Sequence, residues 1–127
     1  MNWEDKFYNI TEIAKGENGF KALVELMDKH PIYDGHFPSE PIVPGVCTLA
    51  IIRRCLSVFL NRGISFEKIK ECKFISVIKP SSGLIISVDI TILKENTVSA
   101  IVYNKDNVVL KLKACLLYTS DAADDLT

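Results

Sequence analysis

Apolar residues in the middle of the chain, from about Val46 to Asn61, recur at spacings of three and four, which is the period of a helix. They cover two faces of this predicted helix, so we expect it to be buried. Gly63, directly after the basic residue Arg62, is typical of a helix stop. The polar residues of the helix fall on one narrow stripe: Arg53, Arg54, Ser57 and Asn61.

Alternating apolar and polar residues predict strands on both sides of the helix. Before it, strands from about Phe7 to Ile13 and from Gly19 to Met27 flank a turn-forming segment, which indicates an opening hairpin. After it, the expected strands run from about Ile69 to Ile78, Leu84 to Leu93, Thr97 to Tyr103 and Val108 to Ala114. One long helix with consecutive hairpin-linked strands predicts an α+β fold, in which an antiparallel sheet wraps around a central helix.

The composition is that of one folded domain and argues against several classes of protein. The chain has 127 residues, of which 48% are hydrophobic, with 15 Lys and Arg against 16 Asp and Glu. Without a basic cluster we expect no nucleic-acid partner. The longest uncharged run covers only residues 41–52, short of the roughly 20 apolar residues that a membrane span needs. The first residues lack the pattern of a secretion signal, so we expect a cytoplasmic protein.

The cysteines and the C-terminal segment supply no chemistry of their own. The four cysteines form no C-x-x-C pair, so neither a zinc site nor a disulfide framework is indicated. Residues 115–125 resemble the translation of a sequencing adapter, so we expect a native domain of residues 1–114 and a non-native tail of residues 115–127. The alternative is a genuine C-terminal strand with an acidic end, because apolar residues alternate through residues 110–116.

The segment from Tyr33 to Val46 carries the candidate chemistry. It fills every position of the signature G-H-F-P-x-x-P-x-x-P-G-V, and on these residues the chain resembles the FabZ/FabA-type 3-hydroxyacyl-(acyl-carrier-protein) dehydratases, which have the hot-dog fold. After the helix, Phe74 to Leu84 resembles the family's F-x-x-x-V-x-P-G-D-x-L, although the Gly-Asp pair is lost. The signature residues are Gly35, His36, Phe37, Pro38, Pro41, Pro44, Gly45 and Val46.

This resemblance implies a hot-dog fold and a site without metal or cofactor, built at the interface of a homodimer or higher oligomer. The implied substrate is a 3-hydroxyacyl thioester on acyl-carrier protein, with its fatty chain in an apolar tunnel. His36 is implied as the catalytic base, and Phe37, Pro44, Gly45 and Val46 as residues that bind the substrate.

The physical chemistry of the segment agrees with these roles. Three prolines within seven residues stiffen the loop that carries His36. Pro44 suits the first turn of a helix, and glycine at residue 45 lets a ligand approach the backbone. Free N–H groups of Gly45 and Val46 would polarise a thioester carbonyl and acidify the neighbouring C2 proton. An imidazole titrating near neutrality can remove that proton, and loss of the 3-hydroxyl gives the 2-enoyl thioester.

The chain departs from the family at the second catalytic group. Where the family has an acidic residue four positions after the signature valine and usually a glutamine four residues later, this chain has Ala50 and Arg54. Guanidinium stays protonated, so Arg54 cannot act as a general acid, but it could hold an anion or a water; the alternative is an ordinary surface charge. Asp34 and Glu40 are candidate substitute acids. His30 is expected to be a solvated turn residue.

Three functions follow as hypotheses. The first is a divergent dehydratase in which His36 acts with water or a substitute acid. The second is a non-catalytic hot-dog subunit that binds acyl thioesters or completes a heterodimer. The third is a thioesterase, because the same fold hosts that chemistry. A thioesterase needs a group that activates water near the start of the helix, and Cys47, Thr48 and Ala50 offer no carboxylate.

Overall fold

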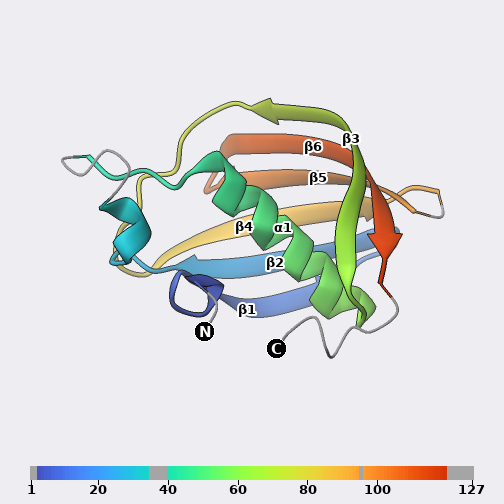
Figure 1. Cartoon of the computed structure of the whole chain (residues 1–127), viewed down its shortest axis with the longest axis horizontal. Helices are drawn as coiled ribbons and strands as arrows, with labels where there is room; N and C mark the ends of the chain where they lie inside the picture. Colours follow the sequence, from blue (N-terminus) through green and yellow to red (C-terminus); the bar gives the residue numbers. More distant parts are fainter. Residues whose placement is uncertain (1–2, 35–39, 95, 120–127) are drawn as a thin grey trace.

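The computed structural model describes residues 3–34, 40–94 and 96–119. In this part of the chain, six strands form one sheet and a single α-helix lies across it (Figure 1). Short 3-10 helices, η1 and η2, precede β1 and α1. The elements are η1 (Trp3–Lys6), β1 (Tyr8–Lys15), β2 (Gly19–Leu26), η2 (Pro31–Tyr33), α1 (Gly45–Leu60), β3 (Ile64–Phe74), β4 (Leu84–Ile92), β5 (Thr97–Asn104) and β6 (Asn107–Tyr118).

The sheet has the order β1-β2-β4-β5-β6-β3, and every neighbouring pair is antiparallel. The helix follows β2 in the chain, and β3 then crosses from the C-terminal end of α1 to the far edge of the sheet (Figure 1). Register shifts between Phe66 and Lys68 and between Ile69 and Glu71 accompany this long strand. Such bulges bend a strand, which lets β3 curve around the helix. The predicted α+β architecture is therefore confirmed, as is the opening hairpin.

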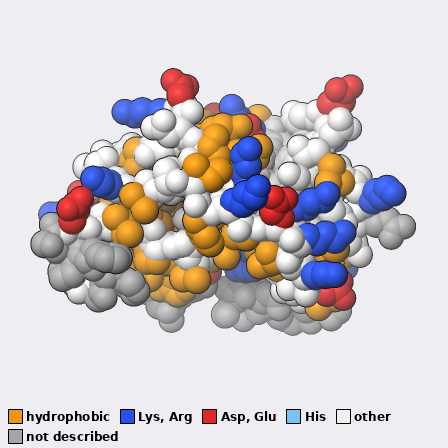
Figure 2. All heavy atoms as spheres, turned by 90° about the horizontal axis from the view of Figure 1, so that it is seen from above, with side chains coloured by type: hydrophobic (Ala, Val, Ile, Leu, Met, Phe, Trp, Pro, Cys, Tyr) orange, Lys and Arg blue, Asp and Glu red, His pale blue; other side chains and the backbone are white. Residues whose placement is uncertain are grey.

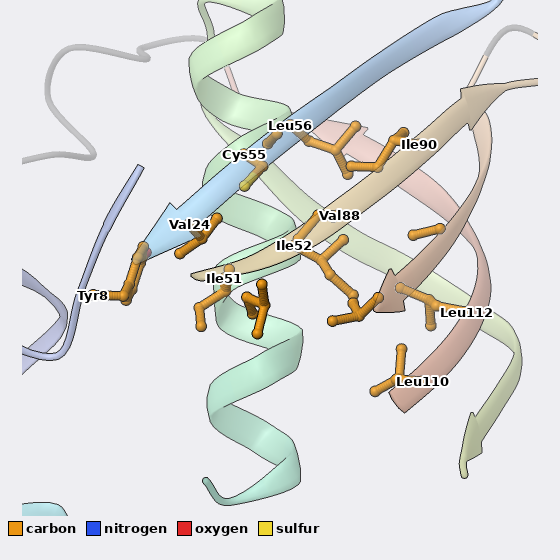
Figure 3. Packing of buried hydrophobic residues seen from close by; sticks show 14 of the residues in the cluster. Tyr8, Val24, Ile51, Ile52, Cys55, Leu56, Val88, Ile90, Leu110 and Leu112 are labelled. Atoms are coloured by element: carbon orange, nitrogen blue, oxygen red, sulfur yellow. The ribbon is translucent and has the colours of Figure 1, made fainter. Parts of the chain in front are cut away.

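The core lies between the helix and the sheet. Ile51, Ile52, Cys55 and Leu56 of α1 are fully buried, and they point toward residues of β2, β4 and β6 (Figure 3). Burying one such aliphatic side chain stabilises the fold by about 1.5 to 3 kcal/mol, so this one face fixes the helix on the sheet. The strand residues that it meets in the figure include Val24, Val88, Ile90, Leu110 and Leu112.

The helix is not buried all round, contrary to the expectation. Val46 and Val58 are exposed at 73% and 49%, so the described residues of the single chain leave part of the apolar surface of α1 uncovered at two places. The helix ends where the pattern predicted, but Gly63 is not the residue that stops it. The helix ends at Asn61, which takes the left-handed conformation with φ 56° and ψ 47°, and its N–H donates to the carbonyl of Ser57. Asparagine tolerates this conformation, so it replaces the glycine that usually stands there.

The strand after the helix begins earlier than predicted, at Ile64 rather than Ile69, and it ends at Phe74 rather than Ile78. Its first residues pair with residues 115–118 at the end of β6, where Ile64 faces Tyr118. The expected boundary after Ala114 thus falls inside β6, and Leu116 beyond it is buried. The division into a native domain of residues 1–114 and a non-native tail stays a prediction.

Candidate active site at the start of the helix

The first turn of α1 presents free backbone donors. Pro44 is the N-cap residue with φ −61° and ψ 142°, and its carbonyl accepts from the N–H groups of Cys47 at 3.0 Å and Thr48 at 3.3 Å. Within the described residues, no acceptor lies in hydrogen-bond reach of the N–H groups of Gly45 and Val46. Together with the positive end of the helix dipole, these two groups can bind the oxygen of a polarised carbonyl.

An apolar hollow of about 520 Å³ opens beside these donors. This volume falls within the range of about 300 to 1,000 Å³ that small-molecule sites occupy. The segment that leads into the helix forms one wall, and it is fixed there because the N–H of Val43 donates to the carbonyl of Ile78 at 2.9 Å. The residues that line the hollow are Ile42, Val43, Pro44, Gly45, Val46, Thr48, Phe74, Ser76, Val77, Ile78 and Val109.

The rim of this hollow carries exposed apolar side chains. Val46, Phe74 and Val77 line it and are 73%, 57% and 56% exposed, and neighbouring Ile75 is 52% exposed. Figure 2 looks onto the molecule from the side where β3 lies, and apolar side chains reach the surface there between lysines and arginines. Apolar residues gathered around a hollow are typical of a surface that another molecule covers.

Gly45 has a second role that the sequence did not indicate. A Cβ atom at this position would lie 2.6 Å from Cε1 of Phe74, so the ring of Phe74 occupies the space that glycine leaves open. The glycine was expected to admit a ligand to the backbone; in the structure its missing side chain admits the end of β3. This contact sets the distance between the first turn of α1 and the wall of the hollow.

Two arginines of the polar stripe, Arg53 and Arg54, lie in different environments. Arg53 is anchored: its Nη1 donates to the carbonyl of Ile64 at 3.2 Å, and its Nη2 lies 3.8 Å from the buried carboxylate of Glu4. Tyr8 donates a hydrogen bond to the same carboxylate. Burial, followed by the hydrogen bond to Glu4, raises the pKa of the Tyr8 phenol well above its usual value. These contacts tie η1 and β1 to the helix.

Arg54 instead lines a separate cavity of about 460 Å³ between α1 and β1, together with Tyr8, Glu12 and Val58 among others. This cavity shares no lining residue with the hollow at the start of the helix. Ala50 lines neither of them. A single chain therefore does not bring Arg54 to the free N–H groups of Gly45 and Val46.

The two candidate substitute acids lie outside the apolar hollow. Glu40 is exposed and forms an ion pair with Lys79 at 3.1 Å. Asp34 is exposed at the C-terminal end of η2, where its N–H donates to the carbonyl of Pro31 at 3.0 Å. His36 and Phe37, the predicted base and one of the predicted substrate contacts, lie outside the described residues.

His30 is a structural residue, not the solvated turn residue that was expected. Its Nδ1 accepts from the N–H of Ile32 at 3.0 Å and caps η2, while its Nε2 lies 3.0 Å from the carbonyl oxygen of Trp3. Its ring also meets Phe7 edge to face. Because Nδ1 accepts a hydrogen bond, it carries no proton. The ring proton is therefore on Nε2, which donates to the carbonyl oxygen of Trp3. His30 thus joins the N-terminal segment to η2.

Cys47 lies in the first turn of α1, where a thiol can be activated, but its own thiol is not. The start of a helix stabilises a thiolate, yet burial raises the pKa of the Cys47 thiol to about 11, and the charge of Glu4 adds to the rise. The residue is 1% exposed. Cys47 is therefore a packed thiol and not a nucleophile.

Among the lining residues, the sequence predicted Pro44, Gly45 and Val46 as site residues, and it missed Phe74 and Thr48 among others. Phe74 was noted only as part of a motif, and Thr48 only as lacking a carboxylate, although both line the hollow. For Thr48 a signal existed, because it is a polar residue in the otherwise apolar first half of the helix, residues 45–52. In the described part of the chain, no group of three or more His, Cys, Asp or Glu side chains could hold a metal ion. There, too, no helix is long and apolar enough to cross a membrane.

The chain matches a family model and is similar to characterised proteins. The family model "ApeI-like: ApeI dehydratase" matches residues 12–112. The 3-hydroxyacyl-(acyl-carrier-protein) dehydratase FabZ of Fusobacterium nucleatum subsp. nucleatum is 31% identical over 96 residues, which cover 72% of this chain and 68% of the relative. FabZ of Caldanaerobacter subterraneus subsp. tengcongensis is 27% identical over 103 residues, covering 74% of this chain and 73% of the relative.

A solved structure confirms the predicted hot-dog fold. The dehydratase heterocomplex ApeI:P from Xenorhabdus doucetiae contains a chain that superposes with a TM-score of 0.69 at 22% identity. The superposition covers 85% of this chain and 96% of that one. At this identity the likeness concerns the fold, namely the sheet wrapped around one helix.

The contact between Gly45 and Phe74 predicts a conditional effect on stability. Gly45→Ala should lower the free energy of unfolding by about 1 to 3 kcal/mol, because the added methyl group collides with the ring. In the Phe74→Ala background the same change should cost much less. Urea unfolding of the four proteins of this double-mutant cycle measures the difference. Equal costs in both backgrounds would contradict the contact.

The burial of Cys47 predicts slow thiol chemistry. Because the thiol stays protonated below a pKa of about 11, iodoacetamide at pH 8 should modify Cys47 in the folded protein far more slowly than in urea. Peptide mapping by mass spectrometry follows this one residue under both conditions. Rapid modification in the folded state would mean that the thiol is reachable and ionised.

Proposed function

The chain belongs to the ApeI-like dehydratase family of hot-dog proteins, and from this premise we propose that it removes water from (3R)-3-hydroxyacyl thioesters on acyl-carrier protein, giving trans-2-enoyl thioesters. The observation that carries the proposal is the first turn of α1, where the N–H groups of Gly45 and Val46 have no partner among the described residues and both residues line an apolar hollow. This arrangement suits a polar thioester with an apolar chain.

In the proposed reaction, the thioester carbonyl oxygen accepts hydrogen bonds from Gly45 and Val46. These bonds stabilise the negative charge that develops on the oxygen when the C2 proton leaves. His36 takes that proton, the electron pair forms the C2–C3 double bond, and the 3-hydroxyl departs. Pro44 holds the donors in place as the N-cap residue, while Phe37 contacts the substrate from the same loop as His36. The acyl chain fills the hollow, which keeps solvent away from the reacting carbons.

The departing hydroxyl needs a proton, and the residue that supplies it in the family is absent at Ala50. We assign this step to a water molecule or to a substitute carboxylic acid, with Glu40 and Asp34 as the candidates. Glu40 is engaged with Lys79 in the single chain, so its use requires that this exposed pair opens. An exposed ion pair of this kind is worth only about 0 to 1 kcal/mol, which makes opening inexpensive.

A second copy of the chain completes the proposed site. The helix presents its free N–H groups to one cavity and Arg54 to another, and the exposed rim at Val46, Phe74 and Val77 remains uncovered. A homodimer or higher oligomer would cover that rim and bring residues of two helices to one substrate. Arg54 would then act as an auxiliary group that holds an anion or a water. The protein is proposed to work in the cytoplasm without a cofactor.

A non-catalytic subunit is the second candidate, and the absence of an acid at Ala50 favours it. The Xenorhabdus doucetiae dehydratase is a heterocomplex, ApeI:P, which supports a role for this chain as one half of an unlike pair. A thioesterase is favoured less, because the polar residue lining the hollow in the first turn of α1 is Thr48, which has no carboxylate, and the Cys47 thiol is protonated.

Activity on a (3R)-hydroxyacyl-carrier-protein substrate tests the proposal. The purified protein should form the 2-enoyl product slowly, and His36→Ala should reduce the rate by at least about 100-fold, as general-base catalysis predicts. Lys29→Ala, an exposed charge outside the site, is the control and should keep the rate. Ala50→Glu should raise the rate by restoring an acid. Product is followed by its ultraviolet absorbance, and folding by thermal melting.

Equal inactivity of the natural chain and of His36→Ala, with acyl-carrier protein still bound, would replace the enzyme by the non-catalytic subunit. Release of free thiol from an acyl thioester would instead point to a thioesterase.

A further inference from the structure

Thr48 carries a hydroxyl group that the proposed mechanism has not used. The residue is 3% exposed and lines the apolar hollow one turn into α1. No described residue lies in hydrogen-bond reach of its Oγ1. The fully covered side-chain oxygens that lack a partner are Oδ1 of Asp89 and Oδ1 of Asn104, and Oγ1 of Thr48 is not among them. The hydroxyl oxygen is therefore not fully covered, and it belongs to a residue that lines the hollow.

A hydroxyl on an almost fully buried residue is more stable when it forms a hydrogen bond. Leaving a buried hydroxyl unpaired costs about 1 to 3 kcal/mol, and a threonine in a helix can avoid this cost by bonding to the carbonyl four residues earlier. Here that carbonyl belongs to Pro44, and it accepts from the backbone N–H groups of Cys47 and Thr48 instead. The other hydroxyl in the lining, Ser76, donates to the carbonyl of Val108 at 2.8 Å. Among the side chains of the described lining residues, Thr48 thus has the uncommitted hydroxyl donor.

The position of Thr48 along the helix matches one group of the proposed substrate. Thr48 follows Gly45 and Val46 by two to three residues, which corresponds to roughly 3 to 4.5 Å along the axis at about 1.5 Å per residue. In a 3-hydroxyacyl thioester the hydroxyl stands two carbons beyond the carbonyl. With the carbonyl at Gly45 and Val46, the 3-hydroxyl can therefore reach the depth of Thr48.

We propose that the Thr48 hydroxyl donates a hydrogen bond to the 3-hydroxyl oxygen of the bound acyl thioester, and so selects 3-hydroxyacyl chains over saturated ones. This inference rests on the proposed function, whose substrate class it refines. Thr48 transfers no proton. Its hydrogen bond holds the C3–O bond in one orientation and stabilises the charge that builds on the departing oxygen, in a chain that has alanine where the family has an acid.

Two substitutions distinguish the effect of the Thr48 hydroxyl on binding from the effect of the side chain's shape. Thr48→Val replaces the hydroxyl by a methyl group of similar size, and Thr48→Ser keeps the hydroxyl. Both are placed in the full-length chain with His36→Ala, so that no ligand is turned over. The probes are a 3-hydroxydecanoyl and a decanoyl pantetheine amide, and calorimetry measures their dissociation constants.

Thr48→Val should weaken binding of the hydroxylated probe about five- to tenfold, the value of one hydrogen bond, and leave the saturated probe unchanged. Thr48→Ser should keep most of the preference. Thr97→Val, which makes the same change at a half-buried threonine on β5 outside the hollow, is the matched control and should not alter the ratio of the two affinities. Thermal melting verifies that each variant folds.

The inference is overturned if Thr48→Val weakens both probes equally, or weakens neither. The first result would place the hydroxyl at the carbonyl or in the packing, and the second would leave it without a ligand. Failure of the proposed function looks different: the chain with His36 would then form no enoyl product, while the probes are still distinguished through Thr48. A folded chain that binds neither probe would overturn both proposals.

Discussion

The position of the first turn of α1 against the end of β3 is the constraint on which the proposed site depends. Gly45 has no side chain, so the ring of Phe74 can lie against the helix start, and the hydrogen bond from Val43 to Ile78 fixes the segment that enters the helix. The buried face at Ile51, Ile52 and Leu56 holds the rest of the helix on the sheet. With the helix fixed at both places, its first N–H groups lie beside an apolar hollow and have no partner in the part of the chain that the structure describes.

The same placement explains why one chain is an incomplete catalyst in this account. A helix presents its first N–H groups in one direction and its side chains in all directions. In this chain the free N–H groups border the apolar hollow, while Arg54 borders a polar cavity next to β1. Exposed apolar residues at the rim, such as Val46 and Phe74, supply the surface that a second copy or an unlike partner would cover. In the proposed oligomer, the site would be shared between two chains, and the partner could supply the acid that is missing at Ala50.

The sequence predicted the fold well because its signals are local. The helix showed its period, and turns marked the hairpins between strands. The start of β3 was missed because residues 64–66 and 68 pair with residues 115–118, which were expected to belong to a tail. The end of the helix was predicted correctly, but the stop was attributed to Gly63 rather than to Asn61, because asparagine in the left-handed conformation leaves a weaker signature than glycine. His30 was misjudged because its partners, Trp3 and Ile32, come together only in the fold.

The sequence predicted the site residues that belong to a motif. It did not predict those that come together only when the chain folds. The signature placed Pro44, Gly45 and Val46 at the helix start, but neither the ring that packs on Gly45 nor the uncommitted hydroxyl of Thr48 follows from spacing.

The most direct test of the account is a crystal structure with a 3-hydroxydecanoyl pantetheine amide. The account predicts its carbonyl oxygen at about 2.7 to 3.2 Å from the nitrogens of Gly45 and Val46, with the chain in the hollow. A chain bound elsewhere, with the N–H groups still unpaired, would contradict it.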